Sequence, residues 1–254
     1  MGIDLHKVSF TKRLAAALLD FVLLAVLVSG AATLLAVTLG YSSHADTIDA
    51  RQQHFEKQYG IQLQISQEEY DALSAEARQN YDNAFQALIE DEQFLRAYNM
   101  QTSLTMLITA FSVLFGVLAV EFVIPLILKN GQTVGKKIFG IALVRTDGVQ
   151  ASRLQLFIRA ILGKYTIELM IPIYILLMIF FNTANIFTLA ILAGLLLGQL
   201  VCVAATKTNN PIHDLLAGTA AVDMSTQLIF KTKEDLLEHI KKLHAEEANR
   251  AEYF

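Results

Sequence analysis

The chain has 254 residues, of which 54% are hydrophobic and only 17% are charged, and its mean hydropathy is +0.44. Soluble domains have about 25% charged residues, so this composition excludes a disordered chain and is atypical of a soluble enzyme. The formal net charge of −4 provides no overall basic surface, and we expect no nucleic-acid partner. The single cysteine, Cys202, excludes an internal disulfide and a multi-cysteine metal site.

Three long segments contain no Asp, Glu, Lys or Arg, and the third of them has 38 residues. A helix needs about 20 apolar residues to cross a bilayer, so the third segment is too long for one crossing. It contains the polar sequence Asn182-Thr-Ala-Asn185, which predicts a helical hairpin. The fold class is therefore an all-α protein of the lipid bilayer, a multi-pass protein of the cell (plasma) membrane. Its four predicted transmembrane helices are residues 14–39, 102–128, 165–181 and 186–206.

The charges of the connecting segments predict the orientation of the chain. Residues 129–164 carry seven Lys or Arg against one Asp, whereas residues 41–100 carry four basic residues against eleven acidic ones. Segments rich in Lys and Arg remain cytoplasmic. We therefore expect the N-terminus (1–13), the basic segment 129–164 and the tail 207–254 in the cytoplasm. The insert 40–101 is expected to be extracytoplasmic.

The insert has helical signals in its second half. Ser66 and Glu69 have the spacing of a capping box, and apolar residues recur every three or four positions from Tyr70 to Leu95. This stripe is expected to pack against residues 44–59 or against a second subunit. The insert is interpreted as a helical cap, with a ligand-capturing domain as the alternative.

The basic segment contains a predicted strand and a predicted helix. Residues 138–144 are rich in β-branched and apolar residues and precede the turn signal Asp147-Gly148. They are expected to form a small β-hairpin or strand element with residues 219–223. After the candidate cap Ser152, apolar residues share one face, which predicts a helix lying in the membrane interface before the third span.

The cytoplasmic tail is predicted to contain two helices. A short helix is expected to begin with Pro211 in its first turn and to end at Gly218. An amphipathic helix is expected from Lys233 onward, with Thr232 as its cap.

Ionisable residues in or beside the predicted spans are the candidate functional groups, because a charge at the bilayer centre costs at least ~2.5–3.5 kcal/mol. Arg13 and Asp20 are seven residues apart on one helix face and are expected to form a pair. Glu168 is four residues after Lys164, and a simple pair between them is the structural alternative. The transport or ion-binding candidates are Asp20, Glu121, Glu168 and Asp214, and the supporting charges are Arg13, Lys136, Arg159, Lys164 and His213.

Two of the membrane acids occur in the same pattern, E-x-x-I-P, which ends at Pro125 in one helix and at Pro172 in the other. Proline has no N–H, so both prolines are candidate helix breaks that leave the carbonyl of a glutamate free. A carboxylate beside a free carbonyl offers oxygen ligands to a cation. Glu121 has no basic neighbour on its own helix and is the candidate proton carrier, with Glu168 as a fixed charge. Alternatively, the prolines only bend the helices.

Other motifs predict no chemistry. The sequence from Gly131 to Lys136 resembles a phosphate loop but has the wrong spacing and no Ser or Thr after the lysine. The histidines have no metal-ligand spacing, and no nucleophile has a base partner, so we expect no enzyme, no catalytic residue, no cofactor and no metal. Gly194 and Gly198 have a spacing typical of close helix packing, either within the chain or in a homodimer.

Three of these sequence elements resemble the RDD family of bacterial integral membrane proteins, whose name marks one arginine and two aspartates. The first is Lys12-Arg13 followed by Asp20, and the second runs from Gly131 to Val144, with Asp147-Gly148 and Arg159 after it. The third is His213-Asp214, followed by Gly218-Thr219 and Val222. The resemblance covers residues 10–39 and about 102–223. It implies transport, and in some members cation/proton antiport.

Two functional hypotheses follow. The first is a transporter that exchanges a monovalent cation for a proton through the four candidate acids. The second is a non-transporting membrane scaffold or partner-binding protein. Four helices are few for a transporter unless it forms a homodimer, which favours the second hypothesis for a monomer. An intramembrane enzyme has no support beyond the acids themselves.

Overall fold

The computed structural model describes residues 4–251, and the chain forms two compact units. Unit 1 joins Met1–Val28 to Val113–Phe254, and unit 2 is Ser29–Ser112. Among the described residues, four helices are long and apolar enough to cross a membrane, as predicted. They are Phe10–Thr38, Glu92–Ile127, Arg153–Phe180 and Ile186–Ala205.

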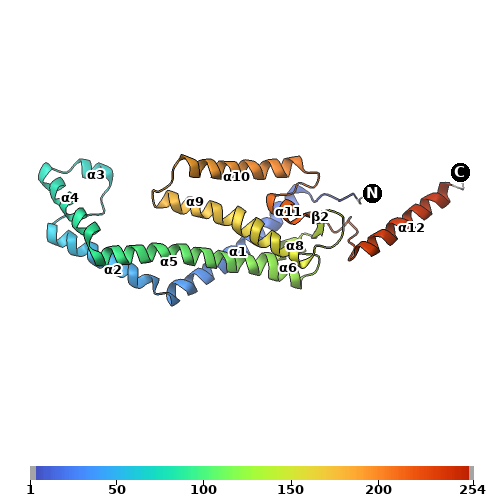
Figure 1. The fold of residues 1–254 in the computed structure, drawn as a ribbon, viewed down its shortest axis with the longest axis horizontal. Helices are drawn as coiled ribbons and strands as arrows, with labels where there is room; N and C mark the ends of the chain where they lie inside the picture. The colour runs from blue at the N-terminus through green and yellow to red at the C-terminus, as the bar shows by residue number, and fades with distance from the viewer. Residues whose placement is uncertain (1–3, 252–254) are drawn as a thin grey trace. The chain divides into compact units, whose positions relative to one another are not determined.

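The last two spans form the predicted hairpin. The helices α9 (Ile171–Phe180) and α10 (Ile186–Ala205) contact each other and lie side by side in unit 1 (Figure 1). Asn182 adopts a left-handed backbone conformation with φ of 53° and ends the first helix. The side chain of Asn185 then accepts hydrogen bonds from the backbone of Phe187 and Thr188 and begins the second. The polar break in the sequence therefore forms the turn.

The helix that begins after Ser152 continues into the third span. The segments α8 (Arg153–Ile158), η2 (Arg159–Met170) and α9 join into one helix of 28 residues. Ser152 and Gln155 form a capping box at its start, as the sequence indicated. The separate interfacial helix before residue 165 is not formed, because the chain is helical without interruption from Arg153 to Phe180.

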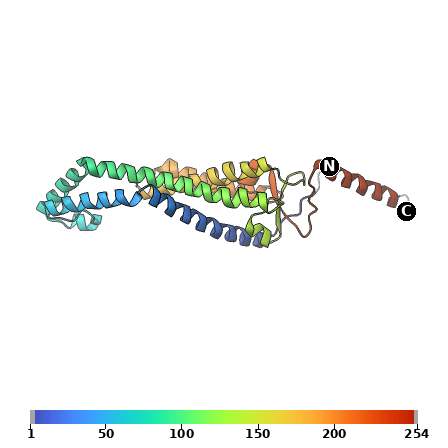
Figure 2. The same ribbon diagram turned by 90° about the horizontal axis from the view of Figure 1, so that it is seen from below.

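The second span is also longer than predicted. The segments α5 (Glu92–Val117), η1 (Leu118–Val123) and α6 (Ile124–Ile127) form one continuous helix (Figure 2). It begins at Glu92 rather than at residue 102, because the side chain of Asp91 accepts a hydrogen bond of 2.8 Å from the backbone N–H of Phe94. The first span is α1 (Phe10–Thr38).

Unit 2 contains the helical insert. The helices are α2 (Tyr41–Tyr59), α3 (Gln67–Asp71) and α4 (Ala75–Glu90), and the Ser66–Glu69 capping box is present. The expected long helix is interrupted before α4, where Ser74 caps a new helix. As predicted, the apolar stripe packs against α2. The shared core consists of Phe55, Leu63, Ala84 and Leu88.

A small antiparallel sheet lies in unit 1, as predicted. The strands β1 (Ile141–Arg145) and β2 (Thr219–Asp223) pair along their full length, with Ile141 opposite Asp223. Short helices lead into both strands, α7 (Val134–Ile138) and α11 (Ile212–Ala217). Gly218 ends α11 with φ of 62°, and Pro211 caps its start. The tail helix α12 (Lys233–Ala251) is capped by Thr232, whose hydroxyl accepts from Asp235 N.

Candidate functional site

A network of charged side chains lies inside unit 1, where residues from both ends of the chain meet. Its members come from α1, η1, α7, η2 and α11, which are separated by up to about two hundred positions in the sequence. All four candidate acids and all five supporting charges predicted from the sequence belong to it or line its cavities. They are Arg13, Asp20, Glu121, Lys136, Arg159, Lys164, Glu168, His213 and Asp214.

Arg159 is the centre of this network. Its side chain is 2% exposed. Its Nε donates to Asp214 at 2.7 Å and its Nη1 donates to Glu121 at 2.6 Å. The planar guanidinium thereby joins η2 to both η1 and α11. A buried charge is tolerated only when it is paired and hydrogen-bonded, and Arg159 meets that condition for two carboxylates at once.

His213 extends the network from Arg159 to Glu168. Its Nε2 lies 3.0 Å from Nη2 of Arg159, which can only donate, so Nε2 is the acceptor. Its Nδ1 lies 2.8 Å from Glu168 and carries the ring proton. A neutral imidazole satisfies both contacts. Burial lowers the pKa of His213 despite the nearby Asp214 carboxylate, which agrees with this tautomer.

Glu121 has three cationic neighbours rather than none. Besides Arg159, it accepts a short hydrogen bond from Lys164, and Nζ of Lys136 lies 3.8 Å away. The carboxylate of Glu121 is therefore not isolated from basic groups, although its expected isolation was the reason for naming it the proton carrier. Its partners come from other segments of the chain and are invisible in the spacing along its own helix.

Glu168 does not pair with Lys164, which contacts Glu121 instead. Both oxygens of Glu168 lie 2.8 Å from Nδ1 of His213. The simple i, i+4 pair that was the structural alternative is therefore not formed. Among the described residues, no lysine or arginine forms an ion pair with Glu168, so its carboxylate is held by a neutral ring.

Arg13 and Asp20 are not paired, contrary to the prediction. Asp20 accepts hydrogen bonds from the Thr133 hydroxyl at 2.5 Å and from Gly135 N at 2.8 Å. Arg13 donates to three backbone carbonyls, and its guanidinium lies against the strand β2. These carbonyls belong to Thr208, Asn209 and Ala221. Both residues face the interior, but each takes its partners from a different segment.

Thr133 and Gly135 are site residues that the sequence reasoning missed. Thr133 is fully buried, caps α7 and donates to Asp20. At Gly135 an added Cβ would collide with the carbonyl oxygen of Ala16, so only glycine allows α7 to approach α1. The signal was the Gly131–Lys136 motif, which has the wrong spacing for a phosphate loop and belongs to the second element of the family resemblance.

The two prolines do not break their helices. Each follows a π-helical segment, η1 before Pro125 and η2 before Pro172. At each junction a backbone N–H donates five residues back, from Ile124 to Ala119 and from Ile171 to Thr166. This wider register accommodates the missing proline N–H, and π-helical turns are frequent at functional sites. Glu121, Arg159, Lys164 and Glu168 all project from these two segments.

Two cavities adjoin the network within unit 1. One of about 140 Å³ is lined by Asp20, Lys136 and Asp214, among others. A second of about 230 Å³ is lined by Asp20, Glu121 and Glu168. Both volumes are large enough for water molecules, and the charged linings provide the polar partners that buried water needs.

The charges of the network balance. Four cations face four carboxylates, with His213 neutral, so there is no surplus of negative charge for an additional cation. Among the described residues, no group of three or more His, Cys, Asp or Glu is arranged to hold a metal ion. Burial, followed by repulsion from Arg159, lowers the pKa of Lys136 to about 8. Burial alone would raise the pKa of Asp214, but Arg159, His213 and Lys136 together outweigh it and hold the value at about 2.

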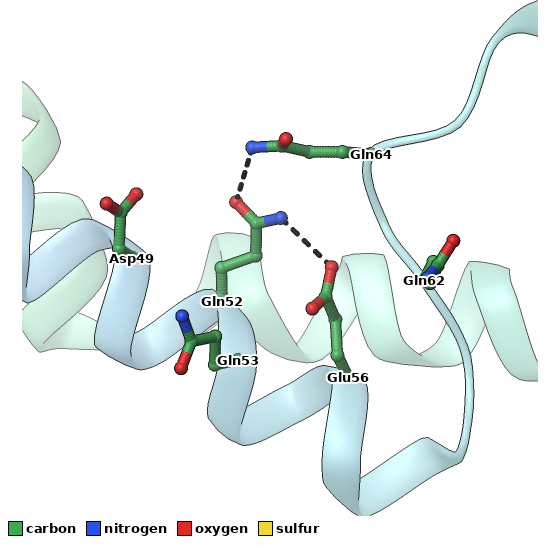
Figure 3. Close-up of a pocket in the computed structure, with 6 residues that line it drawn as sticks. All are labelled: Asp49, Gln52, Gln53, Glu56, Gln62 and Gln64. Carbon is green, nitrogen blue, oxygen red and sulfur yellow. Dashed lines mark hydrogen bonds between the residues drawn. The ribbon is translucent and has the colours of Figure 1, made fainter.

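Unit 2 has a pocket of a different kind (Figure 3). It has a volume of about 420 Å³ and lies between α2 and the loop that follows it. Gln52 is central in it and donates to Glu56 at 3.0 Å, while Gln64 donates to Gln52 at 3.3 Å. The lining is polar throughout: Asp49, Gln52, Gln53, Glu56, Gln62 and Gln64.

Comparison with known proteins gives one match. A model of the RDD family matches residues 7–218, most of the chain, whereas no curated protein and no solved structure matches it. The arginine and the two aspartates assigned to the family's pattern are Arg13, Asp20 and Asp214, and all three line the cavity of about 140 Å³. The chain therefore belongs to the RDD family and is a membrane protein with four apolar helices long enough to cross a bilayer.

Proposed function

We propose that this protein is a transporter that exchanges a monovalent cation for a proton at the charged network of unit 1. The observation that carries the proposal is Lys136. Its side chain is 12% exposed and its ammonium group has a long contact of 3.8 Å with Glu121. Burial lowers the pKa of Lys136 to about 8. It is therefore the member of the network whose charge changes most readily near neutral pH.

Charge balance explains how the exchange works. When Lys136 loses its proton, the network has one carboxylate more than its cations can balance. A monovalent cation that enters the adjoining cavity restores neutrality, with oxygens of Asp20 and Glu121 as its ligands. When Lys136 regains a proton, the cation is expelled. One proton thus replaces one cation, and the two never need to occupy the network together.

The remaining charges have a structural part in this mechanism. Arg159 keeps its charge at every physiological pH and holds Glu121 and Asp214 in place. The cost of burying ionisable groups in a membrane supports a functional role for the network, because such residues mark substrate and proton pathways. Transport is also what the family resemblance implies.

Purified protein in sealed liposomes tests the proposal. Sodium or potassium gradients should drive proton movement, and the rate should rise as the pH increases through about 8, because the neutral lysine admits the cation. Lys136→Arg keeps a permanent charge and should abolish the exchange, whereas Lys136→Met should leave cation movement that is independent of pH and is not coupled to protons. Lys137→Arg is the matched control, because the neighbouring lysine is exposed. Unchanged exchange in Lys136→Arg would refute the mechanism.

A non-transporting scaffold is the second candidate, and a specific observation favours it. Every carboxylate of the network already has a partner, as expected of a network that holds the helices together. In that case liposomes should show no flux of any cation or proton with the wild-type protein, and Lys136→Met should change stability alone.

The proposed orientation places the insert outside the cell membrane and the strand-containing segment in the cytoplasm. Cysteines at Glu76 and Lys137, both exposed, test it in a Cys202→Ser background. An impermeant thiol reagent should label Glu76→Cys in intact cells and Lys137→Cys only after the membrane is opened. Labelling of both in intact cells would refute the orientation.

A further inference from the structure

A third cavity in unit 1 lies beside α10 and adjoins the charge network at Glu168. It has a volume of about 190 Å³, and its walls come from η2, α9, α10 and α11. Most of the lining is apolar: Ile167, Pro172, Leu192, Leu195, Leu196 and Ile212. The polar lining residues are Glu168 and Gln199, and the Gln199 side-chain carbonyl accepts a hydrogen bond of 3.0 Å from Ile212 N. Glu168 is therefore the one charged group among the described residues that line this cavity.

The carboxylate of Glu168 differs from those of Glu121 and Asp214. Glu121 is surrounded by three cationic side chains, and Asp214 is bound by Arg159. Glu168 has only the neutral His213 ring as its side-chain partner among the described residues. Among the described residues, no lysine or arginine is paired with this carboxylate at the wall of the apolar cavity, and an opposite charge close to it would be favourable.

Glu168 also lines the cavity of about 230 Å³ that it shares with Asp20 and Glu121. A ligand bound in the apolar cavity thus contacts the same carboxylate that faces the charge network. The carboxylate of Glu168 therefore connects the apolar cavity to the charge network.

We infer that this cavity binds an amphiphilic organic cation, with its ammonium group at Glu168 and its hydrocarbon chain against the leucines of α10. The charge complementarity excludes an anion, and the apolar lining disfavours a small hydrated metal ion. The volume suits a single short alkyl chain and not the two acyl chains of an aminolipid. The inference concerns binding and does not require that the ligand is transported.

Equilibrium dialysis with radiolabelled octylammonium tests the inference on the purified full chain in a neutral detergent free of aminolipids. Octanol and octanoate have the same chain with no charge and with negative charge, respectively. Octylammonium should bind at least tenfold more tightly than octanol, and octanoate should not bind. Equal affinity for octylammonium and octanol would overturn the inference, because the cavity would then recognise only the chain.

Two variants separate the parts of the site. Glu168→Gln should lower octylammonium affinity about tenfold and leave octanol unchanged, whereas Glu238→Gln, on the exposed face of α12, should change neither. Leu192→Trp fills the cavity and should abolish binding of both. The control Ile191→Trp places the same bulk on the exposed side of α10. Full octylammonium binding in either Glu168→Gln or Leu192→Trp would overturn the inference. Leu192→Trp decides the matter if Glu168→Gln fails to fold.

Discussion

Charged residues are frequent in both units, but they are used in opposite ways. In unit 1 the ion pairs join segments far apart in the sequence, as Arg159 does with Glu121 and Asp214, and they are buried. In unit 2 the pair of Arg96 with Glu92 is one helical turn apart and 78% exposed on both sides, although Arg51 and Asp91 form a second, partly buried pair there. The buried pairs between distant segments determine which elements pack together. The exposed pair within one helix stabilises only that helix.

The largest effect is expected for Arg159→Met, which leaves the buried Asp214 without its cation and removes one of the three cationic neighbours of Glu121. The loss should be about 3–5 kcal/mol in the free energy of unfolding, measured by denaturant in detergent micelles. The matched change in unit 2, Arg96→Met, should cost less than about 1 kcal/mol, because solvent screens an exposed pair. Similar losses for both variants would show that the buried network does not organise unit 1.

The next effect concerns the packing of η2 against α11. At Gly163 an added Cβ would lie 2.6 Å from the Cα of His213, whereas at Gly194 nothing lies within 4 Å. Gly163→Ala should therefore destabilise the protein by about 1–3 kcal/mol. Gly194→Ala should be neutral or stabilising by up to about 1 kcal/mol, since alanine favours a helix. Melting temperatures of the two variants give the comparison, and equal melting temperatures would contradict the packing of η2 on α11.

Two double-mutant cycles distinguish side chains that contact each other from side chains that only lie on the same face of a helix. Arg13→Gln and Asp20→Asn should each cost about 1–3 kcal/mol, because each loses buried hydrogen bonds. Their effects should add to within about 0.5 kcal/mol, since the two side chains have different partners. In unit 2, Arg51 and Asp91 are joined by hydrogen bonds of 3.0 and 2.5 Å, and that cycle should show coupling. Strong coupling between Arg13 and Asp20 would restore the pair predicted from the sequence.

The smallest effect is a pH dependence at the edge of the sheet. Hydrogen bonds from Lys12 and Ser225 lower the pKa of Asp223 to about 2. This carboxylate therefore stabilises the fold above its ordinary pKa, and the contribution is lost as the pH falls from about 4 to about 2. Lys12→Gln should make unfolding less dependent on pH in that window, by about 1 kcal/mol or less. An unchanged pH profile would mean that the pair has no effect on stability.

Local signals predicted much of the fold. Ser66 with Glu69, Ser152 and Thr232 begin helices as expected, because a cap depends on residues three positions apart. The β1–β2 pairing was also predicted, since turn residues and β-branched runs identify strands. The helix lengths were predicted less well. The helix α5 begins at Glu92, after the cap Asp91, and not at residue 102, where the predicted span began.

The candidate site was predicted in its membership but not in its pairing. Burial cost alone identified Asp20, Glu121, Glu168 and Asp214, because ionisable residues stand out in apolar segments. Partners could not be assigned, since spacing along one helix reports only neighbours on that helix. Lys164 illustrates the limit. It lies one helical turn from Glu168 in η2 but contacts Glu121, which belongs to η1.

Proton release on cation binding tests the central claim most directly. Purified protein in weakly buffered detergent solution is titrated with sodium or potassium near pH 8, where Lys136 is half-protonated. The account predicts proton release in proportion to the cation bound, its loss in Lys136→Met and its retention in Lys137→Met. Cation binding with no proton release, or the same release from Lys136→Met, would contradict the account.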